Sequence, residues 1–261
     1  MHNFDFVKPK TVPEAVEALK QEDAMPLSGG QTLMPTMKQR LAAPSVLVSL
    51  TAIAALKGIR VAGNTLEIGA ATTHAEVAAG AKATYPALAA LAGGIGDPAV
   101  RNRGTIGGSL ANNDPAACYP AAVLGSGATV VTNKREIAAD DFFRGLFSTA
   151  LGEGEIITAV RFPLPERAAY AKFQQPASRF ALTGAFVAKY PGGVRVAITG
   201  ASEDGVFRWS AAEKALSGNF DRSAIADLSV AAKGMMGDLH GTPAYRAHLV
   251  KVMTGRAVSA A

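Results

Sequence analysis

Cysteine is almost absent from this sequence of 261 residues, and its scarcity excludes several kinds of site. The single cysteine, Cys118, has no partner in the chain for a disulfide. Iron–sulfur clusters and structural zinc sites need several cysteine ligands, so this chain cannot build either of them with cysteine alone. A chain without disulfides is typical of a cytoplasmic protein.

Long apolar runs are also missing. No run reaches the roughly 18 residues that a membrane helix needs. The first ten residues include Asp5, Lys8 and Pro9, and they lack the apolar core of a signal peptide. We therefore expect no membrane span and a cytoplasmic location.

Histidine is scarce, and neither histidine nor paired acids indicate a catalytic or metal site. The spacing of His2, His74, His240 and His248 matches no metal-binding motif such as H-E-x-x-H. His74 stands at an expected helix start, where a structural role is favoured. The neighbouring acids Asp140 and Asp141 are expected to form a solvated turn. We predict no catalytic residue and no metal ligand.

Clusters of positive charge are absent, although the net charge is +5. Lysine and arginine are scattered, and aromatic residues make up only 7% of the chain. A nucleic-acid or nucleotide-binding module would combine clustered cations with exposed aromatic side chains. The sequence therefore gives this class little support.

Apolar residues are plentiful, at 49% of the chain, and their patterns indicate an α+β fold. Before residue 163 the chain is rich in glycine and alanine, and a loop is expected from 93 to 120. Strands are expected at 4–7, 24–27, 46–50, 59–61, 66–69, 128–132, 156–162, 170–173, 182–190, 194–199 and 206–209. Helices are expected at 11–19, 31–40, 73–79, 86–92, 211–216, 223–233 and 243–254.

Two glycine-rich segments are the main functional signals. The first, residues 27–33, ends a strand in Ser28, Gly29 and Gly30. Glycine permits positive φ and a close approach of the backbone to a ligand, and free N–H groups there favour a phosphate. The second, residues 101–115, pairs glycines with hydroxyl and amide side chains. Two such segments predict a diphosphate held from both sides, although neither the Rossmann nor the P-loop motif is present.

The segment from Ser28 to Pro35 resembles the first FAD loop of the flavoprotein subunits of molybdenum hydroxylases, the carbon monoxide and xanthine dehydrogenase type. The segment from Arg103 to Pro115 resembles their second FAD loop. Residues 170–173 with 177–181 are similar to the start of their C-terminal domain. All three agree in order and spacing, and the resemblance covers residues 3–256.

The resemblance implies the fold of the vanillyl-alcohol oxidase and p-cresol methylhydroxylase flavoproteins. It implies an N-terminal FAD-binding subdomain at 1–55 and a second at 56–165. A C-terminal domain at 166–261 would hold a three-stranded antiparallel sheet and a helix bundle. The last third of the sequence, in which strands are followed by helices, agrees with that domain.

The resemblance also implies sixteen cofactor-binding residues. The first loop would hold the pyrophosphate through its backbone N–H groups, with Ser28, Gly29, Gly30, Gln31, Thr32 and Leu33. The other side would be lined by Thr105, Gly107, Gly108, Ser109 and Asn112. Three further positions match contacts to the adenine end, to the flavin ring and to the face of that ring, namely Ile157, Lys172 and Phe180. A solvated Lys172 and core packing of Phe180 remain the alternatives.

One departure concerns the ribose of the cofactor. Relatives carry an aspartate where Cys118 stands, and a thiol is a poor substitute for a carboxylate acceptor. Either Asp114 or a water then takes that role, or FAD binds more weakly. Cys118 is expected to be a buried small residue rather than a reactive one.

The function implied is that of an FAD-carrying electron-transfer subunit. An iron–sulfur subunit with two [2Fe-2S] clusters and a large molybdopterin subunit would be separate chains, together forming a dimer of heterotrimers. Electrons would pass from those clusters to FAD and then to an external acceptor. A standalone FAD-dependent oxidase or dehydrogenase of the same fold is the alternative, and co-purification with an iron–sulfur chain distinguishes the two.

Overall fold

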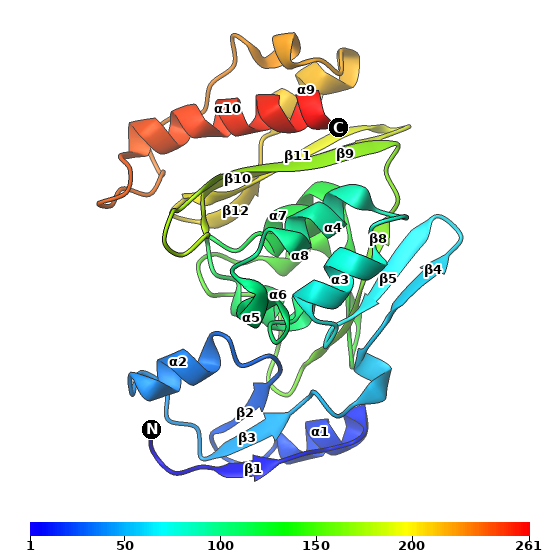
Figure 1. Ribbon diagram of the computed structural model, residues 1–261, viewed down its shortest axis with the longest axis vertical. Coiled ribbons are helices and arrows are strands. Elements are labelled where there is room, and N and C mark those ends of the chain that lie inside the picture. Colours follow the sequence, from blue (N-terminus) through cyan, green and yellow to red (C-terminus); the bar gives the residue numbers. More distant parts are fainter.

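The computed structural model describes residues 1–261, which form three sheets placed one above another along the long axis (Figure 1). The N-terminal sheet is parallel, in the order β1-β3-β2, with β1 at Asp5–Val7, β2 at Ala24–Leu27 and β3 at Val46–Ser49. Helix α1 (Val12–Ala18) begins after Thr11, whose hydroxyl accepts from Glu14 N. Helix α2 (Leu33–Lys38) follows the first glycine loop. These strands and helices were predicted from the sequence.

The central sheet is antiparallel and has five strands in the order β4-β5-β8-β6-β7. They are β4 (Ile59–Ala62), β5 (Thr65–Gly69), β6 (Thr129–Thr132), β7 (Glu136–Ala138) and β8 (Ile157–Pro163). The helices of this layer are α3 (His74–Gly80), α4 (Pro86–Gly93), α5 (Pro98–Arg101), α6 (Ile106–Asn112), α7 (Tyr119–Ser126) and α8 (Ala139–Phe142). A short 3-10 turn, η1 (Ala54–Leu56), precedes β4. The largest hydrophobic core lies between this sheet and its helices.

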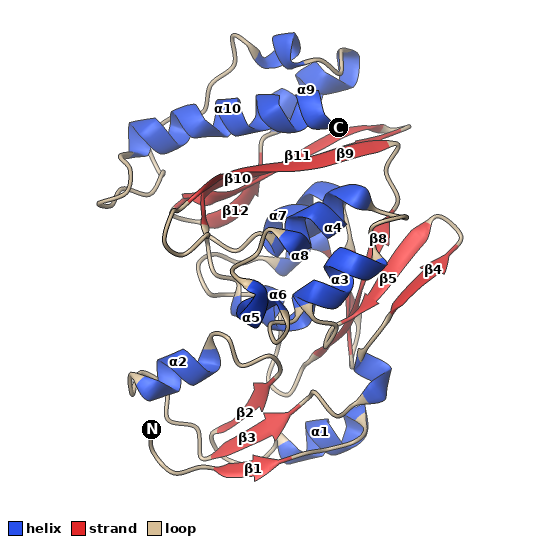
Figure 2. Ribbon diagram, in the orientation of Figure 1, coloured by secondary structure: helices blue, strands red, loops and turns tan.

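The C-terminal sheet is antiparallel, in the order β12-β11-β10-β9, and has a helical layer on one face (Figure 2). Its strands are β9 (Arg167–Gln174), β10 (Ala181–Tyr190), β11 (Gly193–Ser202) and β12 (Gly205–Arg208). Helices α9 (Ser210–Gly218) and α10 (Pro243–Ala260) cover that face, with the 3-10 turn η2 (Arg222–Ile225) between them. The opposite face packs on α4 and α7 of the central layer. This packing joins the two layers through one continuous core.

The predicted loop from 93 to 120 is wrong, because the segment contains α5, α6 and the start of α7. The glycine content hides these short helices in the sequence. Asp97 and Thr105 cap α5 and α6, accepting from Val100 N at 2.9 Å and from Gly108 N at 3.2 Å. Gly107 permits the approach of α6 to Ala70, since a Cβ there would lie 2.6 Å from the Ala70 Cβ.

The predicted helix at 223–233 is also wrong, because only the turn η2 forms there. Leu228 and Val230, two residues apart, both pack against the C-terminal core, and an α-helix would turn them to different sides. The C-terminal sheet has four strands rather than three, since β12 adds the short strand expected at 206–209. The helices α9 and α10 both pack on this sheet.

The pair Asp140 and Asp141 does not form a simple solvated turn. Both residues belong to α8, and the Asp140 carboxylate accepts from Arg195 on β11 at 2.8 Å and from Arg208 on β12 at 3.2 Å. Asp140 therefore links the central layer to the C-terminal sheet. His74, by contrast, is the buried first residue of α3, as expected.

Candidate functional site

The two glycine loops lie in direct backbone contact, although they are far apart in the sequence. A Cβ on Gly29 would lie 2.1 Å from the Arg103 carbonyl oxygen and 2.6 Å from the Gly104 Cα. The hydroxyls of Ser28 and Thr105 lie 2.8 Å apart, within hydrogen-bond distance. Only a residue without a side chain permits this approach, so Gly29 fixes how closely the loops meet.

The first loop presents free backbone donors. The N–H groups of residues 29–33 donate to no acceptor within the protein. Gly30 has φ +70°, a conformation that glycine adopts without a steric penalty. Its carbonyl accepts from Met34 N at 3.3 Å, which starts α2. Consecutive unused N–H groups of this kind suit an anion such as a phosphate.

The second loop differs, because its own amides are already used. Ile106 N donates to Thr72 O at 3.2 Å, Gly107 N to Ala70 O at 2.9 Å and Gly108 N to the Thr105 hydroxyl. The side chains of Ser109 and Asn112 make no hydrogen bond within the protein and lie on the cavity. The two loops are therefore not equivalent: the first offers backbone N–H groups, and the second offers side chains and close packing.

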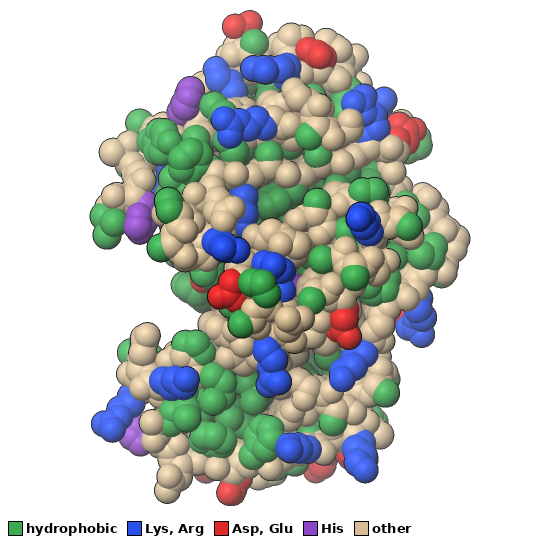
Figure 3. All heavy atoms as spheres, viewed as in Figure 1, with side chains coloured by type: hydrophobic (Ala, Val, Ile, Leu, Met, Phe, Trp, Pro, Cys, Tyr) green, Lys and Arg blue, Asp and Glu red, His purple; other side chains and the backbone are tan.

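The loops line a cavity of about 570 Å³. Figure 3 shows a notch at the edge of the molecule between the N-terminal layer and the layers above it. All sixteen residues predicted from the sequence line the cavity, namely Ser28, Gly29, Gly30, Gln31, Thr32, Leu33, Thr105, Gly107, Gly108, Ser109, Asn112, Asp114, Cys118, Ile157, Lys172 and Phe180. The fold brings together residues from all three layers.

The end of the cavity at the C-terminal sheet is positively charged. The Lys172 ammonium donates to Gly94 O at 2.8 Å and to Arg179 O at 2.7 Å, and it lies 3.6 Å from the Cys118 sulfur. The Arg179 guanidinium also lies here, donating to Gly96 O at 3.3 Å. Neither cation forms an ion pair with an acid. Lys172 is therefore fixed by its neighbours rather than being a freely solvated lysine.

Three further predicted residues, Phe180, Cys118 and Asp114, differ in how far their side chains are exposed. Phe180 is 47% exposed at the cavity, so it does not belong to the core. Cys118 is buried, as expected. Asp114 lines the cavity and accepts from Ala116 N at 2.8 Å, and its burial raises the pKa of its carboxyl.

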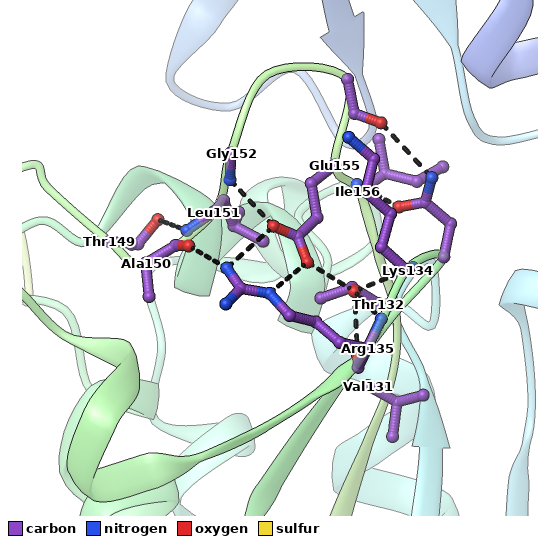
Figure 4. Close-up of polar contacts among 12 residues, drawn as sticks. Val131, Thr132, Lys134, Arg135, Thr149, Ala150, Leu151, Gly152, Glu155 and Ile156 are labelled. Atoms are coloured by element: carbon purple, nitrogen blue, oxygen red, sulfur yellow. Dashed lines mark hydrogen bonds and ion pairs between the residues drawn. The ribbon is translucent and has the colours of Figure 1, made fainter.

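Another part of the cavity wall is apolar and adjoins the N-terminal layer. Ile157 and Ile156 line it, and Ile156 also belongs to the small core of the N-terminal layer. The buried carboxylate of Glu155 accepts from Thr132, Arg135 and Gly152 beside them (Figure 4). The Arg135 guanidinium lowers the pKa of Glu155 to about 2.

Sequence analysis missed several residues of the cavity. Glu155, Ile156 and Arg179 line it, and so does His74, although only a structural role was expected for His74. Burial lowers the pKa of His74 to about 4, and the Arg101 charge adds to this effect. Arg179 stands in the segment 177–181 next to the predicted Phe180, whereas the sequence carries no spacing signal for Glu155, Ile156 and His74, which reach the cavity through tertiary packing.

The residues present fit FAD. The cavity lining has unused N–H groups and glycines, a fixed cation on the C-terminal sheet and buried aliphatic side chains next to the N-terminal layer. A dinucleotide with a diphosphate, a flavin ring and an adenine presents groups that match these three regions. The fold and the cavity thus define an FAD-binding flavoprotein.

The chain belongs to the family described as the FAD binding domain in molybdopterin dehydrogenase, whose model matches residues 2–165. The carbon monoxide dehydrogenase medium chain of Hydrogenophaga pseudoflava is 34% identical over 277 residues, which cover 99% of this chain and 96% of that one. The nicotine 6-hydroxylase medium subunit of Paenarthrobacter nicotinovorans is 33% identical over 97% of this chain and 95% of its own length.

Solved structures agree with the sequence relatives. Carbon monoxide dehydrogenase from Hydrogenophaga pseudoflava, in a form lacking the Mo-pyranopterin moiety, matches with a TM-score of 0.91 and 36% identity over 100% of this chain and 97% of the matched chain. Quinoline 2-oxidoreductase from Pseudomonas putida 86 matches with a TM-score of 0.89 and 29% identity over 100% and 97% of the two chains. The protein is thus an oxidoreductase subunit, the medium FAD subunit of a molybdenum hydroxylase-type complex. None of its helices combines the length and the apolar character that a membrane crossing needs.

Proposed function

We propose that this chain receives electrons from the [2Fe-2S] clusters of a partner subunit and passes them through FAD to an external acceptor. The observation that carries the proposal is the contact of the two glycine loops at Gly29 and Arg103, because both loops line the same cavity. The chain has one cysteine and so cannot build such a cluster itself. Bound FAD supplies the two-electron chemistry, while the protein positions it.

Each part of the cavity has a role in this proposal. The unused N–H groups of residues 29–33 bind the diphosphate, with Thr105, Ser109 and Asn112 across from them. Ile157 packs on the adenine end. Lys172 faces the flavin ring, where its ammonium favours negative charge on the reduced ring. Phe180 covers the ring at the mouth of the cavity, and Asp114 accepts from the ribose in place of the aspartate that Cys118 replaces.

The partners are an iron–sulfur subunit and a large molybdopterin subunit, in a dimer of heterotrimers. The high coverage of relatives named as medium chains and complex subunits supports an assembly of several different chains. Within this chain we propose FAD-binding subdomains at 1–55 and 56–165 and a C-terminal domain at 166–261. The three sheets, which fall within these limits, support the division.

Co-purification tests the proposal. An affinity-tagged chain, expressed with its neighbouring reading frames, should bring down an iron–sulfur chain and a large chain, together with FAD. Anaerobic addition of a reducing substrate to that complex should bleach the iron–sulfur and flavin absorbance together. A flavin-loaded chain that recovers no partner and reacts directly with a reducing substrate would instead identify a standalone flavoprotein.

A further inference from the structure

The cavity wall next to the N-terminal layer is a loop, residues 149–156, that has no regular secondary structure. It carries Leu151 and Ile156, and β8 continues it with Ile157; all three line the cavity. A loop wall can select a ligand only if something keeps it in place, because a mobile apolar segment adapts to any shape or collapses into the space.

Glu155 keeps this loop in place through a saturated carboxylate. One oxygen accepts from the Thr132 hydroxyl at 2.7 Å and from Arg135 Nε at 3.0 Å. The other accepts from Arg135 Nη2 at 3.1 Å and from Gly152 N at 2.9 Å. Four donors occupy the carboxylate, and its side chain is only 2% exposed. Glu155 thus acts on the loop and on the β6–β7 turn, not on a ligand.

The β6–β7 turn, residues 133–135, binds the same loop at further points (Figure 4). Arg135 Nη2 donates to Ala150 O at 2.7 Å, and Lys134 Nζ donates to Glu153 O at 2.7 Å. The Asn133 amide accepts from Ile156 N at 2.9 Å and donates to Gly154 O at 3.3 Å. The loop is therefore bound at Ala150 and from Gly152 to Ile156, and the Glu155–Arg135 pair is the strongest part, because both partners are charged.

We propose that Glu155 is a positioning residue that fixes the wall of Leu151, Ile156 and Ile157 against the adenine of FAD, and that it thereby makes the chain select FAD over FMN. The inference rests on the proposed placement of FAD in this cavity. The wall lies against the N-terminal layer, whereas Lys172 and Phe180 reach the cavity from the C-terminal sheet and the loop after β9. If FAD spans the cavity from Lys172 to this wall, FMN held at Lys172 lacks the adenosine that would reach the wall.

The test is equilibrium binding of FAD and of FMN to the full chain freed of flavin, followed by flavin fluorescence. In Glu155→Gln, the amide cannot replace an anion that accepts from four donors. We expect the Kd for FAD to rise at least tenfold while the Kd for FMN changes by less than twofold. Arg135→Lys, on a side chain that is 54% exposed, keeps the charge but loses the fork geometry. Arg135→Lys should raise the ratio of the Kd for FAD to the Kd for FMN by a smaller factor, in a chain that remains folded.

Glu67→Gln is the matched control. Glu67 lies on β5 of the same sheet and pairs with Arg161 and Arg60, but it does not line the cavity. It should alter neither Kd. The inference would be overturned if Glu155→Gln and Arg135→Lys raised the Kd for FAD and the Kd for FMN by the same factor, or if they changed neither Kd. Either result would indicate a purely structural pair. If the unaltered chain bound neither flavin, the proposed function itself would fail.

Discussion

Single residues at this site act mainly by being small or by being buried. Gly29 has no side chain where the backbone of Arg103 and Gly104 passes, and Gly107 has none where Ala70 passes. His74 is buried beside the same segment, with its Nδ1 atom lacking a hydrogen-bond partner and its ring 5.3 Å from that of Tyr119. Each kind of residue leads to a prediction that a single substitution can test.

Gly29→Ala should abolish FAD binding and lower stability. The added Cβ would lie 2.1 Å from a backbone oxygen, so the two loops must separate. Overpacking of this kind typically costs about 1–3 kcal/mol. Gly192→Ala is the control, because its Cβ would meet nothing within 4 Å. Denaturant titration and FAD titration of both variants check this, and retention of FAD by Gly29→Ala would contradict the loop contact.

Because of His74, the free energy of unfolding should fall as the pH drops from 6.5 to 4. The pKa of His74 is lowered from its ordinary value of 6.5 to about 4 in the folded protein, because burial disfavours the charged ring. Between these values the unfolded chain binds a proton that the folded chain does not, so acid favours unfolding by up to roughly 3 kcal/mol. His74→Asn, which does not titrate, should show a flatter dependence of the unfolding free energy on pH. If the unaltered chain and His74→Asn showed the same dependence of unfolding free energy on pH, His74 would not be the residue responsible.

At the scale of elements, short capped segments form the site. Helix α6 has only seven residues, and its cap, Thr105, also contacts the first glycine loop through Ser28. Gly107 is tolerated in this helix because it allows close packing against Ala70. The cap of α6 thus combines a local role with a long-range one.

Thr105→Val should lower both stability and FAD affinity. The valine keeps the shape of the side chain but loses the bonds to Gly108 N and to the Ser28 hydroxyl, a loss of about 1–2 kcal/mol. Thr242→Val, which removes the cap of α10 from Tyr245 N, provides the comparison. It should lower stability by a similar amount without changing the Kd for FAD. Equal FAD affinities in the two variants would show that the Thr105–Ser28 contact does not matter for the cofactor.

The whole molecule is held by two large cores and one small one. The central core includes Phe186, Ala188 and Ala197 from the C-terminal sheet, so the central and C-terminal layers share it. The N-terminal layer depends on a separate core of seven buried residues. The surface link through Asp140, whose side chain is 45% exposed, adds little to this arrangement.

Phe186→Ala should therefore destabilise the central and C-terminal layers together. Phe186 is fully buried and packs near Tyr85 and Tyr170, and such truncations cost about 3–5 kcal/mol. Asp140→Asn should cost less than about 1 kcal/mol. Hydrogen exchange should show residues 1–55 opening before the other layers, and FAD should slow that opening. Independent opening of the C-terminal sheet in Phe186→Ala would exclude a shared core.

The sequence by itself determined the local features and the family. Strand ends at Leu27, the caps Thr11 and Thr73 and the hairpin at Gly63 follow from preferences that act over a few residues. The segments at 28–35, 103–115 and 170–181 were sufficient to identify the family, and all sixteen residues predicted from that resemblance line the cavity. These signals are contiguous in the chain, so they can be read without knowledge of the fold.

Only the tertiary structure decided that the first glycine loop offers backbone N–H groups while the second offers side chains, and which residues support the cavity wall. The contact between Gly29 and Arg103, the engagement of the amides of α6 by Thr72 and Ala70, and the network of Glu155 join residues that are distant in sequence. Packing also made helices of a glycine-rich segment and prevented one at 223–233. Such contacts arise from the burial of particular faces against each other, a choice made by the whole chain rather than by any local pattern.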